Sequence, residues 1–384
     1  MTTADPQRRD VYVPAAIALV LFKVFVLGLA FGSGALLPGF FSESSYRGNF
    51  HWPPDQPPTL ATRLETWDAQ HYLYLATEGY GPGRWSIAFF PLYPWLIRAV
   101  AALPGIAPLA AALLVANALS LAAFLMLLRF LEERHPGAGQ GALLLLLAFP
   151  GALFFHLPYT ESLFLFLAVA VAAATASGRM PFAAAAAFLL ALTRPNGVLI
   201  AAVLAHAAWS RWRRDRRIPA AHLLALASPF LGFGVYLAFM QSAAGGAFAG
   251  FAMQDAFHAG RSMASLVDLP HLARELADVR AFHGIDHSLL DRLAFLFALS
   301  TLVPLWRLDR SLFWYALPMA LVGPLSGSLV SYTRFAAVLF PCHLVLARAL
   351  NGERRRPWLW LTIAVFYGLQ IVLLLRHVNF RWAG

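Results

Sequence analysis

Long runs of apolar residues, separated by short loops that carry arginine, constrain this chain more than any other feature. A helix needs about 20 apolar residues to cross the roughly 30 Å hydrocarbon core of a bilayer, and a broken or re-entrant helix needs fewer. The sequence therefore predicts an all-α polytopic membrane protein in which residues 1–384 form a single integral membrane domain. The expected spans are residues 13–37, 108–131, 141–156, 162–176, 220–242, 289–306, 312–325, 335–350 and 358–375.

Composition supports this class and excludes others. Hydrophobic residues make up 60% of the chain and charged residues 12%, against roughly half and about a quarter in soluble domains. The formal charge of +10 does not indicate a nucleic-acid partner, because the arginines cluster at the ends of apolar spans rather than along one face. The only cysteine, Cys342, lies inside an apolar run, so neither a disulfide framework nor a cysteine metal site is expected. The first apolar run lacks an Ala-x-Ala exit and is expected to remain as an anchor.

Residues 182–209 form one further apolar segment, which is interrupted by Thr193-Arg194-Pro195-Asn196-Gly197. Proline disfavours a helical conformation at the residue before it and Asn-Gly favours a turn, so we expect two short helices here. The total then becomes about eleven transmembrane helices. The alternative is a single continuous pass, which would move every later arginine cluster to the other side of the membrane.

The arginine-bearing loops set the expected orientation, because basic residues accumulate in cytoplasmic loops. With a turn at Arg194, the clusters at 8–9, 129–134, 179, 211–217, 307–310 and 354–356 all fall on one side. The extracytoplasmic side then receives the first loop, residues 38–106, and a second large loop, residues 243–287. We expect a multi-pass protein of a bacterial inner (plasma) membrane, whose contacts include membrane lipid and whose active site is extracytoplasmic.

The first loop is expected to become helical after a proline-rich, irregular stretch at residues 42–59. Asp68, His71 and Tyr72 are spaced at i, i+3 and i+4, so they share one face of an amphipathic helix that ends at Gly79. The pair Trp67-Asp68 places a carboxylate beside an aromatic ring where the chain first leaves the lipid, a position suited to a general base. The alternative is that Asp68 caps the helix and His71 is an interfacial polar residue.

Two further motifs face the same side. Phe89-Phe90-Pro91-Leu92-Tyr93-Pro94 is either an interfacial aromatic anchor or the rigid wall of a pocket for a lipid-linked sugar, in which Tyr93 would bind substrate. Tyr159-Thr160-Glu161-Ser162 forms a short turn between two spans. Its carboxylate, Glu161, either complements the dipole of the following helix or holds an acceptor hydroxyl or a cationic partner.

Arg194 is the costliest residue of the chain to place in a membrane, because arginine within membrane segments is expensive and usually paired or functional. Arg334, in Ser331-Tyr332-Thr333-Arg334-Phe335, is expected at the same face. Two arginines that converge there suggest an anionic ligand, since the planar guanidinium binds phosphate oxygens bidentately. The alternatives are snorkelling to lipid headgroups, or ion pairs with Glu161 or Asp68.

The second loop is rich in polar residues but gives no clear site. Its string His283-Gly284-Ile285-Asp286-His287 superficially resembles a metal site. Neither the spacing on a defined element nor a second cluster supports metal binding, so we expect no metal and no other cofactor.

Taken in order, the motifs resemble those of the PIG-V-like mannosyltransferase family. Single motifs such as Trp-Asp are weak, but Phe-Phe-Pro-Leu-Tyr-Pro and Thr-Arg-Pro-Asn-Gly in this order and membrane context are specific, and the resemblance spans most of the chain. Residues 243–287 match only loosely, which leaves the choice of acceptor open. The motifs are Trp67-Asp68, Gly79-Tyr80, residues 89–94, Tyr159 to Phe164, residues 193–197, and Tyr332 with Arg334-Phe335 to Pro341.

The resemblance implies a GT-C glycosyltransferase bundle that uses a polyprenyl-phosphate sugar, usually mannose, as its donor. Asp68 matches the acidic residue that such enzymes use as base, and Arg194 and Arg334 match motif arginines, to which charge and position assign the donor phosphate. The acceptor would be a glycolipid, a glycan or a protein. The residues expected to bind substrate are Trp67, His71, Tyr93, Tyr159, Glu161, Arg194, Asn196, Gln254, Tyr332 and Arg334.

The expected chemistry fits these residues. An acceptor hydroxyl must lose its proton as it attacks the anomeric carbon, and a carboxylate can take that proton. A base on the face opposite the leaving phosphate implies inversion, so a β-linked mannosyl donor would give an α-mannoside. Two other classes stay open: a secondary transporter or flippase, because broken helices are also typical of transporters, and a non-catalytic subunit of a glycan assembly machine.

Overall fold

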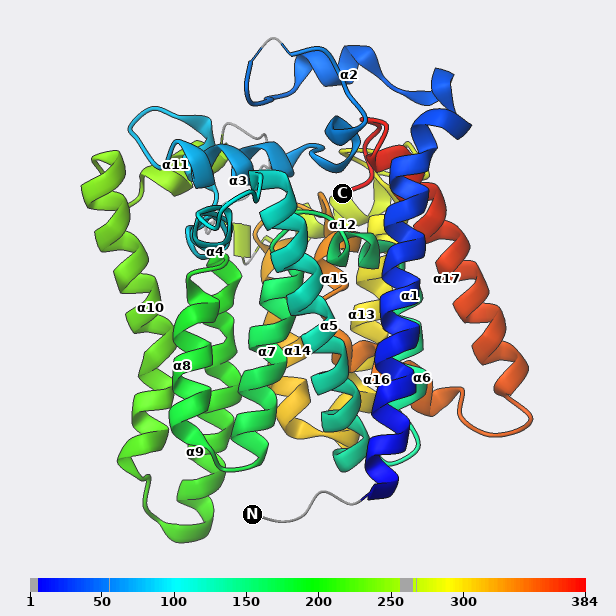
Figure 1. Ribbon diagram of the computed structural model, residues 1–384. Coiled ribbons are helices and arrows are strands. Elements are labelled where there is room, and N and C mark those ends of the chain that lie inside the picture. The colour runs from blue at the N-terminus through cyan, green and yellow to red at the C-terminus, as the bar shows by residue number, and fades with distance from the viewer. Residues whose placement is uncertain (1–5, 55, 256–264, 267) are drawn as a thin grey trace.

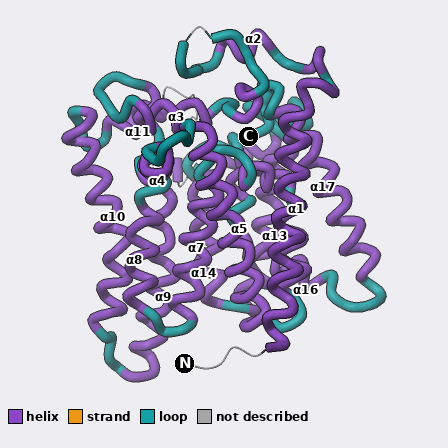
Figure 2. Tube along the Cα trace, viewed as in Figure 1, coloured by secondary structure: helices purple, strands orange, loops and turns teal. Residues whose placement is uncertain are grey.

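The structure is a computed structural model that describes residues 6–54, 56–255, 265–266 and 268–384. Helices account for 74% of the chain, and the described residues contain no β-strand. Figure 1 shows an upright bundle of helices capped at one end by shorter elements, and Figure 2 shows that longer loops gather at that same end. The α-helices are α1 (Pro6–Leu36), α2 (Glu43–Gly48), α3 (Asp68–Thr77), α4 (Leu92–Ala101), α5 (Pro108–Arg134), α6 (Gly139–Ala148), α7 (Glu161–Ala176), α8 (Met180–Ala191), α9 (Ala201–Asp215), α10 (Ala220–Ala244), α11 (Ala249–Asp255), α12 (Leu269–Ala277), α13 (Leu289–Leu308), α14 (Arg310–Leu325), α15 (Tyr332–Ala336), α16 (Phe340–Ala349) and α17 (Arg356–His377).

Within the described residues, five helices are long and apolar enough to cross a membrane. They are Val13–Leu36 of α1, then α5, α10, α13 and α17. Three shorter apolar helices, α6, α7 and α8, accompany them. The outer faces of α1, α10 and α17 expose many large apolar side chains, such as Ile17, Phe230 and Val365, as expected of helices surrounded by lipid. The chain is a helical membrane protein.

Two of the predicted spans are not continuous helices. Residues 141–156 comprise α6 followed by the 3₁₀ helix η4 (Pro150–Phe155), and residues 335–350 are divided between α15 and α16. Proline explains both differences. Pro150 disfavours helix at Phe149, and Pro341 lies in the first turn of α16, where it has no N–H to continue the hydrogen bonding of α15. The breaks matter for the site, since η4 packs against α15.

The segment at residues 182–209 breaks where the sequence predicts. It forms α8, the 3₁₀ helix η5 (Pro195–Ile200) and α9. A side-chain methyl at Gly197 would overlap the carbonyl oxygen of Leu190 and lie 2.7 Å from its carbon, so only glycine fits this tight return. The Arg194 side chain contacts Glu161 at the start of α7, which places the turn at the end of the bundle where α7 begins.

That end also carries α2, α3 and α11, whereas the arginine-bearing connection between α9 and α10 lies at the opposite end (Figure 1). We call the former the α3 end. The predicted irregular stretch at 42–59 contains the short helix α2, and the second loop contains α11 and α12. The 3₁₀ helix η3 (Trp85–Ala88) connects α3 to α4.

Lys23, the only lysine of the chain, fixes α1 to the bundle. Its ammonium group donates to Asn117 Oδ1 at 3.1 Å and Ser120 Oγ at 2.6 Å, both on α5, and to the carbonyl oxygen of Phe155 in η4 at 3.2 Å. The side chain is therefore a buried structural link between α1, α5 and η4.

Candidate active site

Asp68 is the first residue of α3 and follows a residue with an unusual backbone. Trp67 has a φ of 54°, in the left-handed region that non-glycine residues rarely adopt. Its ring lies edge-on to Trp382, with centroids 5.2 Å apart. The contact with the C-terminal segment holds the strained residue and so fixes where Asp68 projects from α3. The predicted start of the helix at Asp68 is confirmed.

Four charged side chains from distant parts of the chain meet at the α3 end. Arg334 Nη1 donates to Asp68 Oδ2 at 2.5 Å, and its Nε donates to Glu161 Oε1. Arg194 donates through Nη2 to the same oxygen of Glu161. We call Asp68, Glu161, Arg194 and Arg334 the ion-pair cluster. The predicted convergence of the two arginines is present, and so are the ion pairs that were its alternative.

The four charges differ sharply in exposure. The Glu161 side chain is fully buried at 0% and both arginines are 9% exposed, whereas Asp68 is 28% exposed. Glu161 can remain charged in this interior because two cations contact it, which offsets its loss of hydration. Asp68 is therefore the one carboxylate of the cluster that an outside molecule can readily reach.

Aromatic rings enclose the guanidinium groups. The Arg334 guanidinium carbon lies 4.6 Å from the ring centre of Tyr159 and 5.0 Å from that of Phe154, and Arg194 lies 5.4 Å from the ring of Phe335. Such cation–π contacts hold the planar groups in fixed orientations. Burial and the nearby carboxylates together act on Arg334, and the attraction of Glu161 and Asp68 keeps its pKa raised.

Tyr159 connects the aromatic rings around Arg334 to other segments of the α3 end. Its hydroxyl donates to the carbonyl oxygen of Thr66 at 2.8 Å and lies 3.0 Å from Nε2 of His377. Because Thr66 immediately precedes Trp67 and Asp68, this bond links the segment before α3 to α17. Tyr159 lies beside the cluster, as predicted, but its hydroxyl already has partners.

His71 lies one turn after Asp68 on α3 and is buried. Its Nδ1 is 2.9 Å from Ser86 Oγ, and its ring stacks between Phe50 and Phe89 with centroids 4.3 Å and 4.9 Å away. Burial lowers the pKa of His71 to about 4, although the nearby Asp68 opposes this effect. The imidazole is therefore neutral at pH 7 and acts as a packed polar support rather than a cation.

η4 and the start of α13 position the segment that carries Arg334. Ser331, just before α15, adopts a left-handed backbone with a φ of 62°, and the amide of Thr333 donates to Asp291 Oδ1 at 2.7 Å. A methyl group at Gly151 of η4 would overlap the carbonyl oxygen of Thr333, so the glycine permits close backbone approach. η4 and the start of α13 thus hold the segment that carries the arginine.

Four other residues that were expected to bind substrate are placed differently. Tyr93 and Tyr332 are buried, and their hydroxyls donate to the carbonyl oxygens of Ala112 and Ala320 at 3.0 Å each, so both link neighbouring elements. Gln254 Nε2 donates to the carbonyl oxygen of Ala88 at 3.1 Å and fixes α11 to η3. Asn196 is half-buried in η5, two residues after Arg194.

Several residues at the site carried no earlier assignment. Arg194 Nε donates to Thr160 Oγ1 at 2.6 Å, and the adjacency of Thr160 to Glu161 in the sequence could have indicated that contact. Phe154, His377 and Trp382 come from η4, α17 and the C-terminal segment. No local pattern marks them, because their roles arise only from the tertiary packing.

Asp68 and Glu161 are the two carboxylates of the ion-pair cluster, and Glu161 Oε1 accepts hydrogen bonds from both Arg194 and Arg334. Among the described residues, no group of three or more His, Cys, Asp or Glu side chains is placed to hold a metal. His258 of the second loop lies outside the described residues.

Neither a scan against models of protein families nor a search of curated proteins finds a match. The functional conclusion therefore depends on the arrangement of the residues themselves and on the motifs they form.

Proposed function

We propose that this protein is an inverting membrane glycosyltransferase that moves a hexose, mannose, from a polyprenyl-phosphate donor to a glycolipid, glycan or protein acceptor. One observation carries the proposal: Asp68 is a partly exposed carboxylate held by Arg334 at the edge of a buried cluster with two arginines. A base and cations for a leaving phosphate are the groups this transfer needs.

Asp68 is the proposed general base. Asp68 Oδ2 accepts a hydrogen bond from Arg334, which occupies an oxygen that could otherwise take a proton. A donor phosphate that approaches Arg334 would share its positive charge and weaken the hold on Asp68. Donor binding would thereby prepare the base, which then accepts the proton of the attacking hydroxyl.

Arg334 and Arg194 are proposed to stabilise the leaving polyprenyl phosphate. Their charge is balanced by Asp68 and Glu161, so the cluster as a whole is neutral before the donor arrives. Arg194 Nη1 is buried and has no hydrogen-bond partner among the described residues, so it keeps one donor for an incoming oxygen. Glu161 holds both guanidinium groups in place, which preserves their orientation during the reaction. No metal or other cofactor is required by this scheme.

The membrane placement belongs to the proposal as well. The arginine-bearing connections lie at the end of the bundle away from the cluster (Figure 1), and such loops are typically cytoplasmic. The cluster would then face the extracytoplasmic side of a bacterial inner membrane. A GT-C bundle of about eleven passes would require α6, α7, α8, α9, α14 and α16 to span together with the five longer helices.

A secondary transporter or flippase is the second candidate, because the broken helix between α8 and α9 brings buried charges together. The position of the cluster favours catalysis instead. Its carboxylate Asp68 comes from a helix of the first loop and is exposed at the α3 end, whereas transporter sites lie near the midplane of the bilayer.

The test uses purified protein in liposomes with radiolabelled polyprenyl-phosphate-mannose and separate glycolipid, glycan and peptide acceptors. Transfer to one acceptor with an α-linked product, unaffected by EDTA, is expected. A chelator-sensitive reaction restored by one divalent metal would contradict the metal-independent scheme. Movement of intact donor between leaflets without any transfer or release of polyprenyl phosphate would establish the transporter instead.

A further inference from the structure

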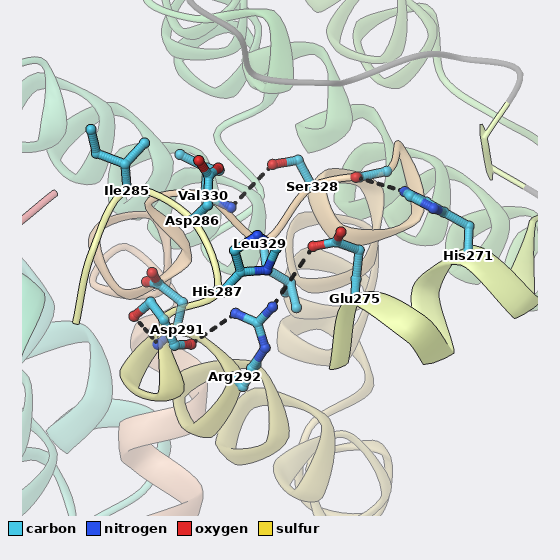
Figure 3. Close-up of a pocket in the computed structure, with 12 residues that line it drawn as sticks. His271, Glu275, Ile285, Asp286, His287, Asp291, Arg292, Ser328, Leu329 and Val330 are labelled. Carbon is cyan, nitrogen blue, oxygen red and sulfur yellow. Dashed lines mark hydrogen bonds and ion pairs between the residues drawn. The ribbon is translucent and has the colours of Figure 1, made fainter. Parts of the chain in front are cut away.

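A second polar cavity lies beside the segment that carries Arg334. It has a volume of about 190 Å³ and is lined by residues of α12, the loop before α13, the first turn of α13 and residues 327–330. Figure 3 shows Glu275 of α12 and Arg292 of α13 approaching each other at this cavity, near His287 of the loop that precedes α13. None of the functional assignments above uses these side chains as ligand contacts.

Arg292 is unusually poorly bonded for a buried arginine. It is 3% exposed, and its Nη1 donates to the carbonyl oxygen of Ser288 at 2.9 Å. Its Nε and Nη2 are buried with no hydrogen-bond partner among the described residues. A buried charged donor without a partner has lost its hydration without gaining a hydrogen bond, which destabilises the folded protein. Arg292 therefore calls for an acceptor oxygen.

Asp291 has the complementary deficit. It is 1% exposed, and while Oδ1 accepts the bond from Thr333, Oδ2 has no partner among the described residues. On the opposite wall, Glu275 Oε2 lies 3.8 Å from Arg292 Nη2, which is an ion pair but too long for a hydrogen bond. The cavity thus presents an unsatisfied donor and unsatisfied acceptors close together.

A hydroxyl group satisfies both kinds of atom at once, because it accepts from a guanidinium and donates to a carboxylate. An anion suits the walls poorly, since Glu275, Asp286 and Asp291 outnumber the single guanidinium of Arg292. The volume is below the roughly 300–1,000 Å³ of sites for drug-sized ligands. These properties fit one uncharged ring that carries several hydroxyls.

The cavity is coupled to the ion-pair cluster through the backbone. Ser328, Leu329 and Val330 line it, and the same segment continues through Thr333 to Arg334. Asp291 is the connection, because Oδ1 accepts from the Thr333 amide while Oδ2 has no hydrogen-bond partner in the described part of the chain. A ligand that bonds Asp291 would therefore bear directly on the segment that positions Arg334.

We propose that this cavity is the acceptor subsite and that it holds one uncharged monosaccharide ring of a carbohydrate acceptor against the ion pair of Glu275 and Arg292. The assignment rests on the proposed glycosyl transfer and deepens it, since it selects a glycan or glycolipid over a protein. The sugar hydroxyls bond Arg292 and Glu275, and the ring enters at the side of the segment that leads to Arg334.

The test measures sugar binding separately from catalysis. Saturation-transfer NMR is recorded on the purified full-length protein with methyl α-mannoside, methyl α-glucoside, methyl α-galactoside and myo-inositol as probes. Two variants address the cavity: Glu275→Gln removes the charge but keeps the shape, and Ile285→Trp narrows the rim at a half-exposed position. Glu43→Gln is the control, because Glu43 is an exposed carboxylate at the α3 end that pairs with Arg47.

At least one probe should bind the wild type and Glu43→Gln, and binding should weaken about tenfold to a hundredfold in Glu275→Gln, as expected for the loss of one hydrogen bond to a charged group. Ile285→Trp should weaken the same probe. No binding of any probe to the wild type, or equal binding by all four proteins, overturns the proposal.

A parallel assay follows hydrolysis of the mannosyl donor without added acceptor, in which water attacks the anomeric carbon and free mannose and polyprenyl phosphate are released. In one outcome, the wild type releases polyprenyl phosphate while Glu275→Gln and Ile285→Trp bind sugar normally. This result would support the glycosyltransferase and contradict the acceptor subsite. Sugar binding that depends on Glu275, without release or transfer by the wild type, would leave a carbohydrate site and remove the proposed transferase.

Discussion

Arg334 donates to two carboxylates from different helices, and the two differ in what their loss should do. Asp68 is partly exposed at the edge of the ion-pair cluster, whereas Glu161 is enclosed by both arginines. Substitution of the first should therefore affect chemistry, and substitution of the second should affect folding. The two predictions below separate these roles.

Asp68→Asn is expected to fold and to lose most transfer, by about 10² to 10⁴ in rate, because the amide keeps the shape of the side chain but cannot accept the proton. Donor affinity should be unchanged or higher, since Arg334 loses a competing anion. Single-turnover transfer and donor binding on the same preparation measure both quantities. Near-normal turnover with an identified acceptor would remove Asp68 from the mechanism.

Glu161→Gln is expected to destabilise the protein by about 3–5 kcal/mol, because it leaves two buried guanidinium groups without their shared anion. Glu43→Gln, which breaks an exposed pair with Arg47, should change stability by about 0–1 kcal/mol. Thermal unfolding in detergent, followed by size exclusion, compares the two. Equal melting temperatures would mean that Glu161 is not the anchor of the cluster.

His71 should make stability depend on pH. Its pKa is lowered to about 4 in the folded protein and is about 6.5 in an unfolded chain. Between these values the unfolded chain binds a proton that the folded chain does not. The stabilisation is therefore complete above about pH 6.5 and is lost toward pH 4, with a total of about 3 kcal/mol. Melting curves from pH 7.5 to 4.5 should fall less steeply for His71→Asn than for the wild type.

Among individual residues, the charged ones were the most readily assigned from the sequence. Asp68, Glu161, Arg194 and Arg334 could be selected because charges are rare and costly in so apolar a chain. Aromatic residues could not be assigned in the same way. Tyr93 sits in a specific motif, yet its hydroxyl bonds the Ala112 carbonyl, and the same motif would arise whether the ring packs helices or lines a pocket.

Among the elements, η4 and α15 decide where Arg334 stands. A methyl group at Gly151 would overlap the Thr333 carbonyl oxygen and lie 3.1 Å from the Cα of Arg334. The backbone cannot yield as a flexible side chain would, so the two elements must separate.

Gly151→Ala is accordingly expected to cost about 1–3 kcal/mol of stability, as overpacking does, and to lower transfer by displacing Arg334. Gly368→Ala is the matched control, because nothing lies within 4 Å of the added methyl in α17. Melting temperature and transfer rate are measured for both variants. An unaltered Gly151→Ala protein would show that η4 and α15 can part without consequence.

Element boundaries were predictable where proline and glycine act locally. The break between α8 and α9 follows from Arg194-Pro195-Asn196-Gly197, which acts on its own neighbours in the chain. The breaks after α6 and before α16 were missed, because long apolar runs concealed Pro150 and Pro341. Hydrophobicity alone does not distinguish one continuous span from two shorter pieces that other helices enclose.

For the molecule as a whole, the central prediction is which end faces outward. Cysteines introduced at the exposed positions Ser44 and Ala273 should react with an impermeant reagent in intact cells, and cysteines at Asp215 and Gly352 should not. Cys342 is buried and should not interfere, and Cys342→Ala serves as the background. The reverse pattern would place the ion-pair cluster in the cytoplasm and exclude an extracytoplasmic donor.

Two properties of the whole molecule could be predicted: that it is a helical membrane protein, and that its arginines cluster at the ends of apolar spans. Both depend on composition and on the ends of apolar runs. The cavity beside α12 could not. It depends on how Glu275, Arg292 and Ser328 approach from three elements, and no spacing along the chain encodes that meeting.

The sequence separations within the ion-pair cluster also order its assembly during synthesis. Glu161 and Arg194 are 33 residues apart, whereas Glu161 and Arg334 are separated by 173 and Asp68 and Arg334 by 266. At the usual 5–20 residues per second, Arg334 leaves the ribosome about 7 to 28 seconds after Arg194. The nascent chain can thus pair Arg194 with Glu161 early, whereas Asp68 has no ion-pair partner until Arg334 has been made. The ion-pair cluster is complete only once Arg334 has been made.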